Sequence, residues 1–595
     1  MNRTWTLILA NGALLAAALF GFLEKGRISG SPALAKAGLF GVTDSFAQLG
    51  RYGRWMTGGR EILEIDLPLR MAYQKDPLSR LIGKPTRTFD EYMRLIEEAS
   101  RDNVVSGILL VVSETALDFA EIEDLRSAIL RFKAQGKSVY AYFENGGNKE
   151  YLLSAASDHI MGAKTAGLFL VGLKTRTVYL KDLLDKLGIR MWVVKEGAYK
   201  TFGDMFTRSS MSESDKEQLG ALMDDLYEKL VATISKERRL DRQSLEQAIR
   251  RAPLTSSEAK AFGLFDSIGY RDDLKRIVKD EEPHRVRFVN FKDYRVRKLF
   301  PVGNPFKRRI ALLNLSGMIL PGESQDMPML RARAILERPT LELLEEIEKD
   351  RSIGALLVRI DSPGGLESPT DQIWRKIRKL GEKKPVIVQA GGVCASGGYY
   401  IASGGNKVIA HPYSVVGSIG VLALKPDVSV LADRLGLRSE TIQRGDHADV
   451  FSPWKGWSPE ELERLKVNIR HDYEMFLEAV AVSRGRSKEE IAELAQGRIY
   501  SGEAALKLGL IDRLGGFFEA LDEAKKAIGL RPQDAAEIVV FPKEKGLFEA
   551  LAQGPLAYKD PYLRLLEPVG CVSEMLDVLG KQHSAVLWPV LFQME

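Results

Sequence analysis

Short apolar runs alternate with amphipathic segments through the first part of the chain. Runs typical of buried strands cover residues 62–66, 107–112 and 137–143, and segments with helical periodicity cover 88–100 and 119–136. Strands and helices that alternate in this order indicate βαβ units built around a parallel sheet. The pattern therefore predicts an α/β fold.

The same order of elements begins again after residue 308. A basic, proline-containing segment, 280–308, interrupts the first series. Strand-like and helix-like segments then follow in the same order at 309–317, 340–350, 354–360, 370–381 and 384–390. A restart of this kind indicates an internal duplication.

Residues can be matched between the two series at a nearly constant separation. Leu187 matches Leu435 and Tyr151 matches Tyr399, each 248 residues further along the chain. We therefore expect two homologous domains. The expected divisions are a first domain at 60–280, a linker at 281–307, a second domain at 308–530 and a tail of uncertain structure at 531–595.

A stretch of 19 residues near the N-terminus, Trp5–Leu23, carries no charge. As a helix it would be about 28 Å long, close to the thickness of the hydrocarbon core of a bilayer. We expect a membrane anchor at 1–24 and a linker at 25–59. Two alternatives stay open: a signal peptide that is removed after Ala33-Leu34-Ala35, and a buried core helix.

The charges around this stretch mildly favour a body on the cytoplasmic side of the membrane. Arg3 alone precedes it, whereas Lys25, Arg27 and Lys36 follow it. Basic residues next to a membrane span stay preferentially in the cytoplasm. This count alone does not settle the side.

Composition excludes several classes of function. The 595 residues include 85 basic and 80 acidic side chains, so the net charge of +5 is too dilute for nucleic-acid binding. Two distant cysteines, Cys394 and Cys571, exclude a disulfide scaffold and a cysteine zinc site. The chain has no H-E-x-x-H, Walker or G-x-G-x-x-G motif, so we expect no metal and no organic cofactor.

A pair of glycines follows a strand in the second domain only. The sequence Asp361-Ser362-Pro363-Gly364-Gly365 comes directly after the strand-like run 354–360, where the first domain has Glu114-Thr115-Ala116-Leu117. Without a Cβ, glycines at this point let backbone N–H groups face an oxyanion. The alternative is an ordinary turn between a strand and a helix.

A serine stands at the expected start of the helix that follows the strand-like run 384–390. Ser396 lies within G-G-V-C-A-S-G-G-Y, where its hydroxyl would be exposed and the N–H of Gly397 could stabilise negative charge. The matching residue of the first domain is Asn148, which cannot act as an alkoxide. Ser396 is therefore a candidate nucleophile, or else a helix N-cap.

A lysine shows the opposite difference between the domains. Lys200 ends the sequence Gly197-Ala198-Tyr199-Lys200, and the matching residue of the second domain is Ala448. A lysine can act as a general base for serine only where burial lowers its pKa, and a site closed between two domains would supply that burial. The alternative is a surface lysine.

Together these features resemble the long, double-domain form of the signal peptide peptidase A family, membrane-anchored bacterial serine proteases. The resemblance rests on D-S-P-G-G, A-S-G-G-Y, the first-domain G-x-Y-K and the segment Val416–Val421, and it spans about 60–530 together with the anchor. It implies two tandem Clp protease/crotonase-like domains, each a spiral of ββα repeats, behind an N-terminal transmembrane helix.

The resemblance also implies a Ser–Lys dyad that works without histidine. It makes Ser396 the nucleophile and Lys200 the general base, so the second domain supplies the serine and the first supplies the lysine. Gly365 and Gly397 become the donors of the oxyanion hole. Ser418 matches a family serine that hydrogen-bonds the lysine.

The implied activity is that of a membrane-bound serine endopeptidase that degrades cleaved signal peptides and other unfolded apolar segments. The implied assembly is a ring-shaped homo-oligomer, a tetramer. It would be held in the bacterial inner membrane with its catalytic body in the periplasm, a location that disagrees with the charge count. The expected partners are peptide substrates, membrane lipid and further copies of the chain.

Three alternative functions are open. His447, with Asp446 and Asp449 beside it, could complete a Ser–His–Asp triad, although no G-x-S-x-G sequence surrounds Ser396. A crotonase-type acyl-CoA enzyme would use the same fold but would need neither Ser396 nor Lys200. A catalytically inactive membrane scaffold would be expected to have lost one of these two residues.

Overall fold

The computed structural model describes residues 58–73, 87–294, 308–322 and 334–543, and the backbone of 585–587. The expected anchor and nearly all of the linker after it therefore lie outside the described residues. Within these residues, no helix is both long enough and apolar enough to cross a bilayer.

The first repeat is built on a sheet of six parallel strands in the order β10-β1-β2-β3-β5-β9. These strands are β1 (Gly59–Asp66), β2 (Val105–Val112), β3 (Ser138–Phe143), β5 (His159–Ala163), β9 (Ser267–Gly269) and β10 (Arg285–Asn290). Its helices are α3 (Phe89–Arg101), α4 (Phe119–Lys133), α5 (Asn148–Ser154), α6 (Lys181–Leu187), α7 (Asp204–Thr207), α8 (Glu213–Arg238), α9 (Arg242–Arg251), α10 (Ser256–Ala261) and α11 (Arg271–Glu281). A small sheet of β4 (Gly146–Gly147), β6 (Gly167–Phe169) and β8 (Leu254–Thr255) completes the repeat.

The second repeat has the same strand order, β22-β11-β14-β16-β17-β21, again with every pair parallel. These strands are β11 (Arg309–Ser316), β14 (Ile353–Ser362), β16 (Val386–Ala395), β17 (Lys407–Ala410), β21 (Arg513–Leu514) and β22 (Glu537–Phe541), with β18 (Val415–Gly417) and β20 (Ile499–Ser501) branching from the end of β16. Its helices are α12 (Glu337–Lys349), α13 (Glu367–Gly381), α14 (Gly397–Ser403), α15 (Ser429–Arg434), α16 (Pro459–Arg484), α17 (Lys488–Leu494), α18 (Gly502–Lys507) and α19 (Phe517–Ala527).

Matched residues occupy matched places in the two repeats. The hydroxyl of Tyr151 donates a hydrogen bond to the carbonyl of Leu264, and that of Tyr399 donates to the carbonyl of Leu510, both at 2.7 Å. The prediction of two tandem α/β domains is therefore confirmed. The finer prediction that each is a spiral of ββα units stays a prediction.

Each repeat extends further along the chain than the sequence indicated. Strand β10 lies within the expected linker 281–307, and strand β22 lies within the expected tail 531–595. Both short segments pair in parallel with the first strand of their own repeat, β1 and β11. Edge strands such as these pair on one side only, and their sequences show a weak pattern of apolar and polar residues, so they are hard to predict.

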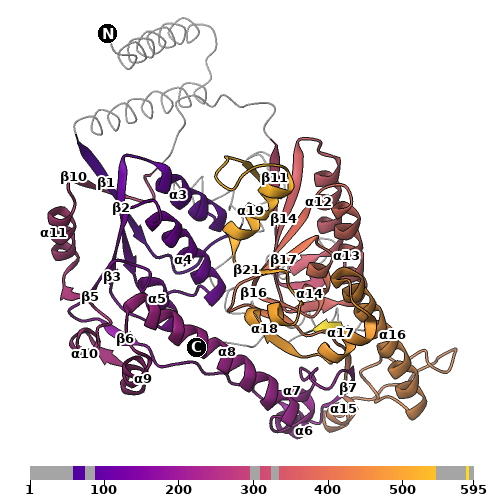
Figure 1. The fold of residues 1–595 in the computed structure, drawn as a ribbon. Helices are drawn as coiled ribbons and strands as arrows, with labels where there is room; N and C mark the ends of the chain where they lie inside the picture. Colours follow the sequence, from indigo (N-terminus) through magenta and orange to yellow (C-terminus); the bar gives the residue numbers. More distant parts are fainter. Residues whose placement is uncertain (1–57, 74–86, 295–307, 323–333, 544–584, 588–595) are drawn as a thin grey trace, which may run out of the picture.

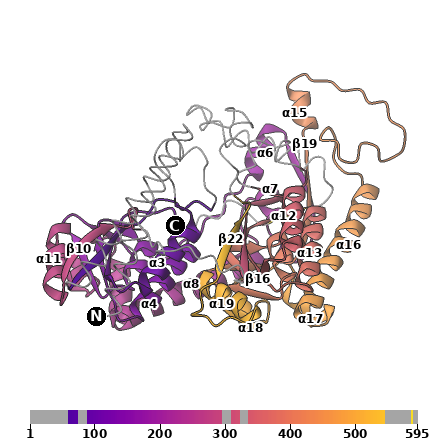
Figure 2. The same ribbon diagram turned by 90° about the horizontal axis from the view of Figure 1, so that it is seen from above.

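The repeats lie side by side and share apolar core (Figures 1 and 2). The main buried cluster joins residues of the first sheet to Ile310, Leu357 and Phe517 of the second repeat. The long helix α8 of the first repeat runs toward the second and lies against β20 (Figure 1). Burial of apolar surface thus stabilises the contact between the repeats.

A buried aspartate reinforces this contact. Asp124 of α4 accepts hydrogen bonds from the amide of Gln389, at 3.1 Å, and from the backbone N–H of Phe517, at 2.6 Å. It also forms an ion pair with His411 at 3.0 Å. Burial raises the pKa of Asp124, but the charges of His411 and Arg359 and the hydrogen bonds from His411 and from the backbone N–H of Phe517 outweigh it and hold the pKa below its ordinary value.

A third sheet crosses from one repeat to the other, in the order β13-β12-β15-β23-β19-β7. Its strands are β7 (Arg190–Glu196) from the first repeat and β12 (Met318–Leu320), β13 (Ala334–Leu336), β15 (Gly364–Leu366), β19 (Val421–Asp427) and β23 (Ala585–Leu587) from the rest of the chain. The antiparallel pair β7–β19 carries the end of β7 into the second repeat.

Candidate active site

The structure brings together three of the residues that the sequence predicted. The Nζ of Lys200 lies 2.6 Å from the Oγ of Ser396 and 3.2 Å from the Oγ of Ser418. It also lies 3.3 Å from the carbonyl oxygen of Ser418. All three residues are at most 1% exposed. The lysine comes from the first repeat and both serines come from the second.

Ser396 occupies a strained position between β16 and α14. Its backbone has φ +56° and ψ −123°, a region that residues other than glycine rarely adopt. Its N–H donates to the carbonyl of Gly417 at 2.7 Å, which holds this turn in place. The hydroxyl makes no capping hydrogen bond to α14, so the side chain does not act as an N-cap. It is aimed instead at Lys200.

Lys200 is held in an environment that disfavours its charged form. Burial lowers the pKa of its amine well below the ordinary value. Across the described part of the chain, no carboxylate forms an ion pair with it that would restore the charge. A neutral amine beside a serine hydroxyl can accept that hydroxyl's proton. The alternative of a surface lysine is therefore excluded by its position.

The two predicted glycines of the oxyanion hole lie next to each other. A Cβ placed on Gly397 would lie 3.2 Å from the backbone nitrogen of Gly365, and one placed on Gly365 would lie 2.1 Å from the carbonyl oxygen of Ile319. Neither position has room for a side chain. Gly397 begins α14 directly after Ser396, so its N–H is among the helix N-terminal donors that have no partner within the helix.

A loop of the second repeat, Gln496-Gly497, packs against the backbone of Lys200. The N–H of Tyr199 donates to the carbonyl of Gln496 at 2.7 Å. A Cβ on Gly497 would lie 2.5 Å from the backbone nitrogen of Lys200, so only glycine fits there. Gln496 itself has φ +55°. The apolar pattern of the sequence does not predict this loop, and the glycine of A-Q-G-R is the one sequence signal of a close approach between two backbones.

A short strand, β23, lies beside Gly365. Strands β15 and β19 each pair in antiparallel fashion with β23, which lies between them. The register sets Gly365 opposite Val586 and Leu422 opposite Ala585. Without β23, the third sheet would have two facing edges at this point. The tail of the chain thus contributes a strand next to the candidate site, which its sequence did not predict.

The histidine alternative finds no support in this geometry. The side chain of His447 is 48% exposed and lies 3.9 Å from Glu460 and 3.8 Å from Glu461, at the start of α16. Ser396, by contrast, is fully buried and contacts Lys200. In the described ranges, no group of three or more His, Cys, Asp or Glu side chains could hold a metal ion.

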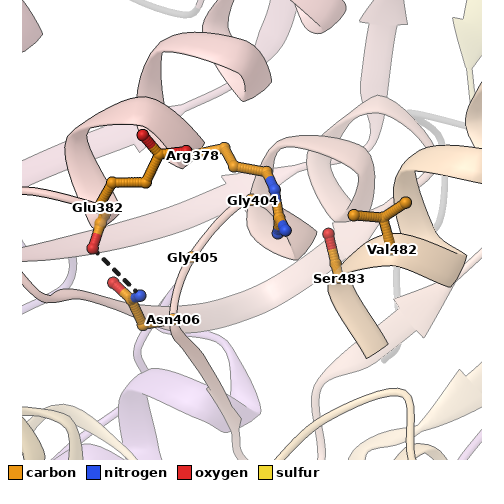
Figure 3. A pocket seen from close by; sticks show the side chains of 8 residues that line it. Arg378, Glu382, Gly404, Gly405, Asn406, Val482 and Ser483 are labelled. Atoms are coloured by element: carbon orange, nitrogen blue, oxygen red, sulfur yellow. Dashed lines mark hydrogen bonds between the residues drawn. The ribbon is translucent and has the colours of Figure 1, made fainter. Parts of the chain in front are cut away.

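A separate surface pocket lies on the outer side of the second repeat (Figure 3). Arg378, Glu382, Gly404, Asn406 and Ser483 are among its lining residues. The amide of Asn406 is bound at both ends by backbone, accepting from Val386 at 2.7 Å and donating to Gly381 at 3.3 Å. Neither Ser396 nor Lys200 lines this pocket, so it is not part of the candidate site.

The amino-acid sequence matches a known protein family. The family model described as Peptidase family S49 matches residues 131–283 and 378–531, one segment in each repeat. The chain is 31% identical over 435 residues to "Serine protease SPPA, chloroplastic" of Arabidopsis thaliana, covering 72% of this chain and 64% of that protein. It is 28% identical over 488 residues to "Protease 4" of Haemophilus influenzae, covering 78% of this chain and 77% of that protein.

Solved structures also resemble the chain. A mutant of the "1510-N membrane-bound stomatin-specific protease" in complex with a substrate peptide is 16% identical, with a TM-score of 0.25, and covers 41% of this chain and 96% of that one. The family model matches both repeats and, in total, somewhat more than half of the chain. This protein therefore belongs to Peptidase family S49.

Proposed function

We propose that the protein is a serine endopeptidase in which Ser396 is the nucleophile and Lys200 the general base. The observation that carries this proposal is the distance of 2.6 Å between the Nζ of Lys200 and the Oγ of Ser396, both fully buried. Membership of a peptidase family and the low pKa of the lysine point the same way. An acyl-CoA enzyme or an inactive scaffold would have no use for this contact.

The reaction follows from the positions of the donors and acceptors. Neutral Lys200 accepts the proton of Ser396 as the Oγ attacks a peptide carbonyl, and the N–H groups of Gly365 and Gly397 stabilise the oxyanion. Protonated Lys200 then gives its proton to the leaving amine, and water hydrolyses the acyl-enzyme. Ser418 orients the amine throughout through its hydroxyl and its carbonyl oxygen.

The substrate that fits the site is an extended peptide. Strands β15 and β19 leave room for one antiparallel strand, the place that Ala585–Leu587 takes here. A peptide bound there would gain backbone hydrogen bonds from both edges and pass the N–H of Gly365. Folded proteins cannot offer a free strand, so the substrates are unfolded segments, and we propose cleaved signal peptides and other apolar segments among them.

We also propose that the copies of the chain form a ring, a tetramer. Strand β7 of the first repeat pairs with β19 of the second, with Val193 opposite Leu424. Shifted by 248 residues, these two strands correspond to segments 438–444 and 173–179, which belong to no strand in the structure. We expect segment 438–444 of one copy to pair with 173–179 of the next, since the same head-to-tail step repeated between copies closes a ring.

Exposed apolar side chains support this arrangement. Val178 is 53% exposed and Ile442 is 90% exposed, and both lie on the two segments that lack a partner strand. Leu183, Leu435 and Leu437 nearby are also more than half exposed. A group of exposed apolar side chains of this kind is typical of an interface between proteins. Figure 2 shows α6 and α15 together on one side of the molecule.

We further propose that Trp5–Leu23 anchors the protein in the bacterial inner membrane, with the body in the periplasm. The support is the length of this uncharged stretch, which as a helix would be about 28 Å, close to the thickness of a hydrocarbon core. The side of the membrane rests on the family resemblance, since the flanking charges favour the opposite side.

Loss of either member of the dyad should abolish peptide hydrolysis. Ser396→Ala and Lys200→Ala should each lower kcat/KM by more than about 10³-fold, and the double variant should be little worse, because the two groups act as one unit. Hydrolysis of a fluorogenic apolar peptide measures this, and His447→Ala is the matched control that should stay active. Substantial activity in Lys200→Ala would contradict the dyad.

Disrupting strand β23 should open the site to substrates. Val586→Pro in the full chain removes a backbone N–H and fixes φ, so it should weaken pairing with β15 and lower KM while kcat is unchanged. Val586→Thr keeps the N–H and is the control. A synthetic peptide of residues 581–591 should inhibit Val586→Pro competitively. Equal KM values in the unaltered chain, Val586→Pro and Val586→Thr, together with no inhibition by the synthetic peptide, would argue against this binding mode.

Pairing between copies can be tested by crosslinking. By the 248-residue correspondence, residues 176 and 441 match the pair Leu424 and Val193, so they should lie opposite each other across two copies. The double variant Arg176→Cys, Thr441→Cys should form disulfide-linked oligomers on mild oxidation, and each single variant should not. Native mass spectrometry should give a tetramer. A monomer, or linkage that also occurs in the single variants, would refute the ring.

Membrane attachment should depend on the N-terminal segment. The full chain should sediment with membranes and resist carbonate extraction, whereas a chain that begins near Gly59 should be soluble and still cleave peptides. Protease protection in intact spheroplasts decides the side of the membrane. A mature N-terminus at Lys36 would show instead that the segment is a removed signal.

A further inference from the structure

A buried glutamine of α8 lies directly behind the lysine. We propose that Gln218 is a positioning residue, which sets the amine of Lys200 against Ser396 by tying the lysine loop to the second repeat. This inference rests on the proposed function of the dyad. Gln218 is 1% exposed, and nothing in its own sequence motif suggested a role.

The amide nitrogen of Gln218 brackets the lysine. It donates to the carbonyl of Tyr199 at 3.2 Å and to the hydroxyl of Thr201 at 2.9 Å, the residues immediately before and after Lys200. One hydrogen bond to the residue before Lys200 and one to the residue after it fix the direction in which the lysine side chain leaves the backbone. The reach of the long lysine side chain toward Ser396 therefore begins from a fixed point.

The amide oxygen of Gln218 reaches the other repeat. It accepts a hydrogen bond from the backbone N–H of Ile499, at 3.3 Å, which also settles which end of the amide is oxygen. Ile499 pairs with Gly417, whose carbonyl accepts the N–H of Ser396 at 2.7 Å. A single side chain thus joins the backbone beside the base to the backbone that holds the nucleophile.

The same connection includes Ser418. Its N–H donates to the carbonyl of Arg498, the residue before Ile499, at 2.7 Å. Gln218 therefore binds the first residue of β20, and the residue just before that strand holds Ser418 in position. Displacement of this point would move both groups that contact the lysine amine.

Gln218 is itself rigidly held. The side chain of Asp215 accepts from Thr201 at 2.7 Å and from Gln218 at 3.2 Å, and the N–H of Asp215 donates to the helix cap Ser212 at 3.3 Å. Buried leucines further along α8, among them Leu222, fasten the helix to the core of the first repeat. The chain of contacts thus runs without a break from that core to the dyad.

The test is the rate at which a small fluorophosphonate probe phosphonylates Ser396 in the full chain, with loss of fluoride, measured across pH together with peptide hydrolysis. Gln218→Met keeps the volume and removes every hydrogen bond. It should lower kcat by about 10²-fold with little change in KM, because a misplacement of about 1 Å costs this much. Water admitted around a loosened Lys200 should raise the pKa of the amine, so the rise in the phosphonylation rate should move to higher pH.

A merely structural role would give a different result. Loss of folded protein lowers the rate equally at every pH and leaves the position of the rise unchanged, and thermal unfolding reports it directly. Glu217→Gln is the matched control, since Glu217 also contacts Tyr199 and Arg498 but does so at the surface. It should behave like the unaltered chain.

Thr201 provides a second pair of variants in case Gln218→Met fails to fold. Thr201→Val removes the hydroxyl that Gln218 grips and should move the pH profile in the same direction, whereas Thr201→Ser should restore it. An unchanged profile in Gln218→Met and in Thr201→Val overturns the positioning role. If Ser396 of the unaltered chain is not phosphonylated by the probe, the proposed function itself fails instead.

Discussion

The contact between the amine of Lys200 and the hydroxyl of Ser396 is the constraint on which the structure around the site depends. An amine accepts a proton from serine only while it is neutral, and near neutral pH a lysine is neutral only when it is removed from water. That removal needs protein on every side. Here the first repeat supplies the lysine and its loop, and the second supplies both serines and Gly497, so neither repeat alone could enclose the amine.

Backbone strain is concentrated around this same contact. Among the described residues other than glycine, four have positive φ, and three of these are Ser396, Ser418 and Gln496. Each such conformation costs on the order of 1–3 kcal/mol. Backbone hydrogen bonds offset the cost: the N–H of Ser396 binds the carbonyl of Gly417, and the N–H of Ser418 binds that of Arg498. Rigid sheets therefore hold both serines in geometries that a flexible loop would relax.

The duplication made the candidate dyad predictable from the sequence, because matched positions of the two repeats can be compared. Ser396 against Asn148, and Lys200 against Ala448, are differences between two copies of one pattern, so they could be read without a structure. Gln218 could not be found in this way, because its role depends on an approach to Ile499, 281 residues away, that only folding creates. Strand β23 was hidden for a similar reason, since a strand of three residues is defined by the two neighbouring strands it pairs with and not by its own sequence.

The differences between the repeats also bear on assembly. Asn148, at the place that matches Ser396, is buried and uses its amide to bind the carbonyl of Gly172 at 2.8 Å, which is a structural role. Ala448, at the place that matches Lys200, lies in an irregular loop of the second repeat. In the proposed ring, segment 438–444, shortly before Ala448, would meet segment 173–179, next to the Gly172 that Asn148 binds, so catalytic contacts within a copy and inert contacts between copies would alternate. An inert contact needs no buried amine and no strained serine. It is therefore free to be selected for affinity between copies, while the contact within each chain keeps the strain and the desolvation that catalysis requires.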